Sequence, residues 1–91
     1  MLTVKPSPHF ERDIKALKKK RRDMSALKQI IGLLTEKKSI PAKYKDHALS
    51  GSFLGYRELH VSWKPDWLLI YEMADDELVL IRTGSHDELF R

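Results

Sequence analysis

One nearly continuous apolar run constrains the fold of this chain more than any other feature: Trp67-Leu68-Leu69-Ile70-Tyr71. A strand without alternation is typical of the middle of a sheet that is covered on both faces. Asp75-Asp76 then gives a turn signal, and Leu78-Val79-Leu80-Ile81 predicts a matching return strand. The chain is therefore expected to build a sheet with the first run near its centre.

Two further segments extend this sheet. Residues 56–61 alternate like a strand with one buried face, so they form a three-stranded meander with the central run and the return strand. Residues 2–5 also alternate and are stopped by Pro6 and Pro8, which predicts a short strand at an edge or one that pairs late.

Two helices are predicted between the first strand and the meander. Phe10, Ile14 and Leu17 recur at spacings of four and three, which indicates a helix that begins at Ser7 or Pro8 and ends near residue 22. Asp23 is a plausible N-cap for a second, antiparallel helix. Its buried face would carry Met24, Leu27, Ile30, Ile31 and Leu34. Residues 35–45 are expected to form a surface connection.

This order of elements predicts an α+β fold in which the helix pair packs on one face of an antiparallel-rich sheet. At 91 residues and 10.7 kDa, the chain is the size of one domain, which we place over residues 1–91. The opposite face of the sheet, or its edge, is then free for function.

The charges are divided unevenly along the chain. Residues 1–45 hold 13 Lys and Arg against 4 Asp and Glu, whereas residues 46–91 hold 4 against 9. A basic half favours an anionic partner, first nucleic acid and second an acidic protein. The strongest concentration is a run of five cations: Lys18, Lys19, Lys20, Arg21 and Arg22.

This run indicates contact with the phosphate backbone of RNA or the ribosome. The alternative is a solvated helix end, because the helix dipole also favours cations there. We favour the RNA contact.

The composition excludes several classes of protein. With no cysteine, the chain has no disulfide, thiolate zinc site or cysteine nucleophile, which fits a reducing cytoplasm. No apolar run approaches the ~20 residues of a membrane span, and the first residues do not resemble a signal peptide. We expect a soluble, cytoplasmic protein without a membrane partner.

Three histidines in the acidic half are candidates for acid-base chemistry: His47, His60 and His86. Histidine can both take and give a proton near neutral pH. The gaps of 13 and 26 residues do not match zinc-ligand spacing, so no metal or cofactor is expected. The alternative for each ring is a half-exposed residue with one hydrogen bond. Asp66 could orient one of them by accepting a hydrogen bond, or could simply open the central strand.

Three other side chains could act on RNA. Arg57 and Arg82 are the arginines within the predicted sheet, where either could stabilise the charge of a reacting phosphate or pair with Glu58 or Glu72. Phe90 could close the core or stack on a base.

Four sequence blocks match a known pattern in the same order: Lys45-Asp46-His47-Ala48-Leu49-Ser50-Gly51, Gly55-Tyr56-Arg57-Glu58-Leu59-His60-Val61, Pro65-Asp66-Trp67-Leu68-Leu69-Ile70-Tyr71 and Arg82-Thr83-Gly84-Ser85-His86-Asp87-Glu88-Leu89-Phe90. Together they resemble the YafQ branch of the RelE/ParE toxin superfamily. The resemblance spans nearly the whole chain and implies the RelE-like fold, with two N-terminal helices against a twisted antiparallel-rich sheet. It also implies a toxin of a type II toxin-antitoxin pair that cuts mRNA on the translating ribosome.

The resemblance further implies a site, whose residues are His47, His60, Asp66, Arg82, His86 and Phe90. We expect His86 to be the general acid and His47 or His60 the base, with Asp66 in support and Arg82 facing the phosphate. The 2′-hydroxyl of the RNA would be the nucleophile, without a cofactor.

The implied partners are a cognate antitoxin, the ribosome with its mRNA, and operator DNA only through the antitoxin complex. The alternative is a non-catalytic, ParE-like or docking module that acts by binding protein. Three histidines near one edge of a sheet favour the nuclease.

In one segment the chain departs from the family pattern. Ser62, Trp63 and Lys64 stand between His60-Val61 and Pro65-Asp66, where the pattern has a single residue. Two extra residues preserve the alternation of a strand and predict a bulge or a longer connection.

Overall fold

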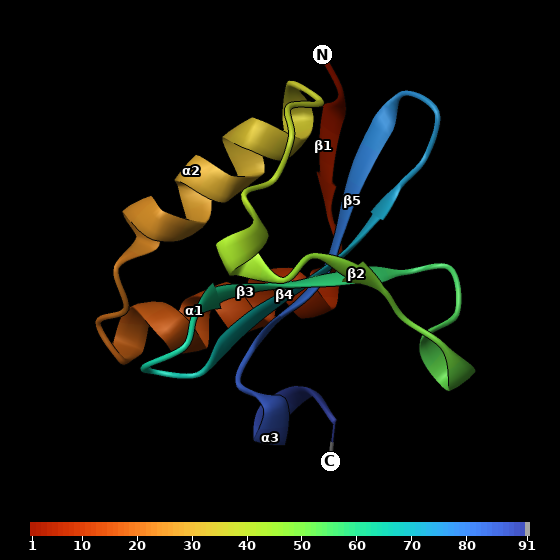
Figure 1. The fold of residues 1–91 in the computed structure, drawn as a ribbon. Helices are drawn as coiled ribbons and strands as arrows, with labels where there is room; N and C mark the ends of the chain where they lie inside the picture. Colours follow the sequence, from red (N-terminus) through yellow and green to blue (C-terminus); the bar gives the residue numbers. More distant parts are fainter. Residues whose placement is uncertain (91) are drawn as a thin grey trace.

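The computed structural model describes residues 1–90, and Arg91 lies outside the described residues. One mixed sheet has the strand order β1-β5-β4-β3-β2, with β1 parallel to β5 and the other neighbours antiparallel. The elements in chain order are β1 (Thr3–Pro6), α1 (Pro8–Lys19), α2 (Met24–Thr35), η1 (Ala42–Tyr44), β2 (His47–Ala48), η2 (Gly51–Phe53), β3 (Arg57–Ser62), β4 (Trp67–Met73), β5 (Glu77–Gly84) and α3 (His86–Leu89). Figure 1 shows α3 lying apart from the α1 and α2 pair. The predicted α+β class is confirmed.

The two long helices begin as the sequence predicts. Ser7 caps α1 by accepting a hydrogen bond from the backbone N of Phe10, and Asp23 caps α2 by accepting one from Ser25. The end of α1 was predicted wrongly: it ends at Lys19, because Arg21 adopts a left-handed φ of 58° that a helix cannot continue through. Only the first two residues of the basic run are therefore helical.

The central strand β4 is covered on both faces, as its apolar run predicts. The residues from Trp67 to Tyr71 are all buried. Trp67, Leu69 and Tyr71 pack against the helices, together with Leu27 and Leu34. On the opposite face, which we call the α3 face, Leu68 and Ile70 pack against Leu89 of α3.

A register shift near the end of the β4 and β5 pair changes which side chains reach the α3 face. Tyr71 pairs with Leu80, but Ile70 pairs with Arg82, so Ile81 is an extra residue. Side chains of paired residues lie on the same face, and a shift of one residue reverses the faces. Arg82 is therefore placed on the α3 face. Thr83 is turned into the core, where its hydroxyl accepts from Trp67 Nε1 at 2.8 Å.

A second irregularity follows His60 at the end of β3. Pairing jumps from His60 to Ser62, which confirms the predicted bulge at the lengthened connection. Trp63 projects from this connection and is 57% exposed, whereas Trp67 is only 2% exposed.

Strand β1 lies at an edge of the sheet, as predicted, and residues 36–45 of the predicted surface connection link α2 to β2 and contain η1. The short elements β2 and α3 were not predicted. Within residues 1–90, the structure has no helix with both the length and the apolar character to cross a membrane.

Candidate active site

His86 is held in place by Asp66 and by its position at the start of α3. Its backbone N donates to Asp66 Oδ2 at 2.7 Å, and its Nδ1 lies 3.0 Å from both carboxylate oxygens. Burial by itself raises the pKa of Asp66, but the hydrogen bonds from His86 outweigh it, so the pKa is lowered. Asp66, expected to support the base, therefore orients the expected acid instead.

His60 lies beside His86 and is largely enclosed. Its ring centroid is 5.7 Å from that of His86 and 3.8 Å from that of Trp63, with which it stacks at an interplanar angle of 10°. His60 is 7% exposed. Its Nδ1 is buried and has no hydrogen-bond partner in the described part of the chain. The ring is thus fixed by stacking rather than by hydrogen bonds to Nδ1.

Glu58 joins the histidines on the α3 face. Strand β2 places His47 directly opposite it, with His47 Nε2 3.6 Å from Glu58 Oε1. Glu58 is only 4% exposed. From the sequence, Glu58 was expected only as an ion-pair partner, although its spacing of two from His60 on a strand places both side chains on one face.

Three of these groups could hold a metal ion. One potential ligand atom from each of Glu58, His60 and His86 lies within 4.8 Å of the others. Imidazole and carboxylate ligands suit zinc or copper, so the donor set fits such an ion. The spacing of the histidines along the chain did not predict this potential metal site, because its donors come from β3 and α3 and are brought together only by the fold.

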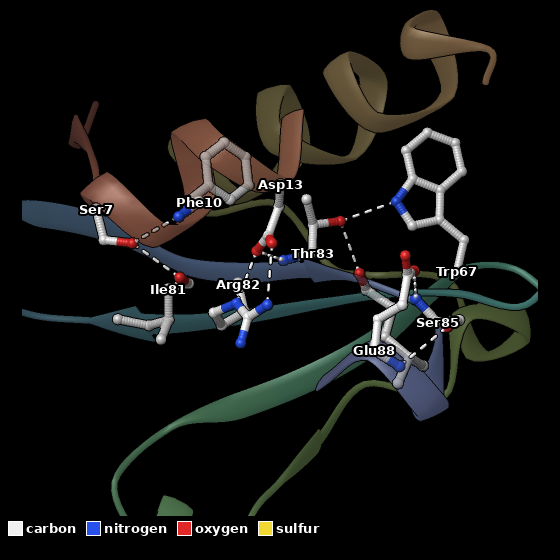
Figure 2. Close-up of polar contacts among 10 residues, drawn as sticks. Ser7, Phe10, Asp13, Trp67, Ile81, Arg82, Thr83, Ser85 and Glu88 are labelled. Carbon is white, nitrogen blue, oxygen red and sulfur yellow. Dashed lines mark hydrogen bonds and ion pairs between the residues drawn. The ribbon is translucent and has the colours of Figure 1, made fainter. Parts of the chain in front are cut away.

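Arg82 forms its ion pair with a residue of helix α1 and not with a glutamate of the sheet. Figure 2 shows Asp13 of α1 reaching across to it, with 2.8 Å between Nε and Oδ2 and 3.0 Å between Nη2 and Oδ1. The same carboxylate accepts from the backbone N of Thr83 at 3.1 Å. The hydrogen bonds to Asp13 raise the pKa of Arg82 above its ordinary value. Glu58 and Glu72, the partners considered from sequence, do not make this ion pair.

The other sheet arginine has a different environment. Arg57 Nη2 lies 3.2 Å from Asp46 Oδ2, and the hydroxyl of Tyr71 donates to the same carboxylate. Burial, reinforced by the Asp46 carboxylate, raises the pKa of Tyr71. Arg57 and Tyr71 thus hold the carboxylate of Asp46, the residue just before His47.

Phe90 lies next to His86 at the end of α3. Its ring meets Phe53 edge to face at 5.2 Å and is 6.1 Å from the ring of His86. Phe90 is 41% exposed, so part of its ring stays available for stacking.

The basic run is connected to α3 through one of its residues. Lys20 Nζ lies 2.8 Å from Glu88 Oε2, and this contact is the main reason that the pKa of Glu88 falls to about 2. Glu88 in turn completes a capping box with Ser85, as Figure 2 shows. Lys18 and Lys19 are exposed.

We expect Lys20→Gln to lower the melting temperature of the protein slightly at neutral pH and much less at low pH. The pKa of Glu88 in the folded state lies below its ordinary value of 4.5, so the stability from this pair is present above pH 4.5 and lost as pH falls toward about 2. Exposed pairs contribute at most ~1 kcal/mol, which corresponds to a shift of roughly 8 °C or less. Thermal melts at pH 7 and pH 2.5 measure this, with Lys18→Gln as the matched control. An equal loss in both variants would contradict a specific role of the contact.

Comparison with known proteins agrees with this architecture. Residues 2–91 match the family described as "Bacterial toxin of type II toxin-antitoxin system, YafQ". The mRNA interferase toxin YafQ of Escherichia coli strain K12 is 43% identical over 88 residues, which cover 96% of this chain and 94% of that protein.

Two solved structures share the whole fold. A copper-bound mutant toxin from Helicobacter pylori has a TM-score of 0.92 and 39% identity, covering 99% of this chain and all of that one. The toxin chain in the E. coli DinJ-YafQ toxin-antitoxin complex has a TM-score of 0.88 and 42% identity, covering 99% of this chain and 98% of that one.

Proposed function

This chain belongs to the YafQ family of bacterial type II toxin-antitoxin toxins, and we propose that it is an mRNA interferase, an endoribonuclease that cleaves mRNA on the ribosome. The observation that carries the proposal is the grouping of His86, His60 and Glu58 on one face, with His86 oriented by Asp66. A single domain over residues 1–91, working in the cytoplasm without a cofactor, is part of this proposal.

The reaction we propose needs a base, an acid and a cation. The base takes the proton from the 2′-hydroxyl of the RNA, whose oxygen attacks the adjacent phosphorus, and the acid protonates the departing 5′-oxygen. We assign His86 as the acid and His47 or His60 as the base. Glu58 lies against His47 and close to His60, so its carboxylate would stabilise the imidazolium that forms when either ring accepts the proton.

The other site residues position the RNA. Arg82 lies on the α3 face in the same cross-strand row as Ile70 and Glu58, where its guanidinium would stabilise charge on the phosphate. Phe90 would stack on a base beside His86.

A bound metal would interfere with this chemistry rather than assist it. A copper or zinc ion held by Glu58, His60 and His86 would supply a Lewis acid. The proposed acid, His86, and one of the two candidate bases, His60, need their imidazole nitrogens for proton transfer. We therefore propose that the chain cleaves RNA with its own residues alone.

Mapping the cut ends in a translation extract tests this mechanism. We expect products with a 2′,3′-cyclic or 3′-phosphate and a 5′-hydroxyl, because the nucleophile is the neighbouring ribose oxygen. Products with 5′-phosphate ends would instead indicate a water nucleophile, typical of metal-dependent nucleases. The end groups are a better readout than chelation, because a chelator also removes the Mg²⁺ that ribosomes require.

The partners follow from the family and from the charges. A toxin chain similar to this one forms the DinJ-YafQ complex, and we propose that a cognate antitoxin binds and blocks this chain too. The exposed Lys18, Lys19 and Arg21 would contact ribosomal RNA, and operator DNA would be reached only through the antitoxin complex. If the translation extract showed no cuts while the antitoxin still bound, the non-catalytic docking module would be the better description.

A further inference from the structure

Four aromatic rings form a row across the candidate active site. Neighbouring ring centroids are separated by 3.8 Å from Trp63 to His60, 5.7 Å from His60 to His86 and 6.1 Å from His86 to Phe90. The two histidines lie in the middle of the row. Its two ends, Trp63 and Phe90, are 57% and 41% exposed.

Trp63 presents an aromatic surface that is fixed in place. One face of its ring is covered by His60, so the exposed part of the side chain includes the other face. Its Nε1 donates to the backbone oxygen of Lys43 at 3.2 Å. The ring is therefore oriented before any ligand arrives, which lowers the entropic cost of binding.

A pocket adjoins this ring. It has a volume of about 240 Å³ and is lined by Lys43, Tyr44, His60, Val61 and Trp63. This is smaller than the roughly 300–1,000 Å³ of pockets for drug-sized ligands, and it suits a single flat ring. Lys43 Nζ lies 5.1 Å from the centroid of the Tyr44 ring, so a positive charge lies beside one of the aromatic rings that line the pocket.

We infer that Trp63, with Lys43 and Tyr44, forms a nucleobase subsite that holds one of the two mRNA bases flanking the phosphate to be cut. This inference rests on the proposed ribonuclease function. Single-stranded RNA is held by stacking its bases on aromatic side chains while cations contact its phosphates. A base on Trp63 and a base on Phe90 would leave the phosphate between them next to His60 and His86.

Trp63 lies in the connection between β3 and β4. It stands between Val61 and Pro65, directly after the register shift that follows His60. The exposed Lys64 follows it in the same connection.

Binding of a short RNA that cannot be cleaved tests the subsite. The probe is a hexanucleotide with 2′-O-methyl riboses, compared with six versions that each lack one base. Anisotropy of a fluorescent label on the probe measures its affinity for the parent and for each variant. In the parent, quenching of tryptophan fluorescence also reports stacking, because Trp63 is exposed whereas Trp67 is buried. We expect Trp63→Ala to bind the complete probe roughly 5- to 150-fold more weakly, and Trp63→Phe to retain most of the affinity.

A double comparison separates stacking from a general loss of binding. Removing one particular base should weaken binding to the parent protein as much as Trp63→Ala does, and should have no further effect in that variant. Leu54→Ala is the matched control, since Leu54 is 78% exposed and is not part of the ring row, and it should bind like the parent. Additive losses from the missing base and from Trp63→Ala would overturn the subsite.

Two further outcomes are decisive. If Trp63→Ala binds the probe like the parent but loses affinity for the antitoxin, the ring docks a protein and the proposal is wrong. The probe is not cleaved, so its binding does not depend on the proposed reaction. Quenching that depends on Trp63 in a protein that cuts no mRNA would refute the proposed function and support the subsite.

Discussion

His86→Ala is expected to slow mRNA cleavage by roughly 10²–10⁴-fold while the protein stays folded. The loss follows from the removal of the general acid, without which the 5′-oxygen must leave as an unprotonated alkoxide. The fold should survive, because the side chain of His86 is 53% exposed and, within residues 1–90, its hydrogen bonds go to Asp66 alone. Cleavage of a defined mRNA in a translation extract measures the rate, and circular dichroism checks the fold.

Two matched variants make this result specific. Asp87→Ala changes the next exposed residue of α3 and should cut at the parent rate. Asp66→Asn keeps the shape of the support for His86 but removes its charge, so it should slow cleavage by less than His86→Ala does. A folded His86→Ala protein that cuts mRNA as fast as the parent would show that His86 is not the acid.

The parts of the fold that could be predicted from the sequence are those set by residues only a few positions apart. The helices were located from apolar residues three and four apart, and their caps Ser7 and Asp23 bond to residues within three positions. The end of α1 was missed because Arg21 takes a left-handed conformation that is unfavourable for arginine, so no preference in the sequence signals it.

The placement of Arg82 depends on the register, which the sequence did not reveal. Residues 78–81 are all apolar, so their pattern does not show that Ile81 is an extra residue. Its ion pair with Asp13 joins positions 69 apart, on a helix and a strand. Contacts of this kind arise only when elements distant in the sequence pack together.

The sequence indicated candidate site residues, but it did not indicate which of their side chains contact one another. The family resemblance indicated His60, Asp66 and His86, and the structure adds that Asp66 bonds to His86. Glu58 could have been found from the strand alternation it shares with His60, yet a buried carboxylate beside a histidine is not apparent until β2 is seen to pair with β3.

Replacing Arg82 is expected to affect catalysis and stability by different mechanisms. Arg82→Gln should slow cleavage by roughly 10²–10³-fold, the usual effect of removing one group that stabilises transition-state charge. It should also destabilise the fold, because the Asp13 carboxylate, 15% exposed, loses its charged partner. Breaking a fully buried pair costs roughly 3–5 kcal/mol, and this pair is partly exposed, so we expect about 1–3 kcal/mol.

The double variant Asp13→Asn/Arg82→Gln separates the two effects. Two neutral amides can still hydrogen-bond to each other, and the Asn oxygen can still accept from the backbone N of Thr83, so urea unfolding should show most of the stability restored. Cleavage should stay slow, because the cation is absent. Asp13→Asn alone keeps the cation and should cut within a few-fold of the parent, despite its lower stability. If the double variant cut mRNA at the parent rate, Arg82 would act only in holding α1 to β5.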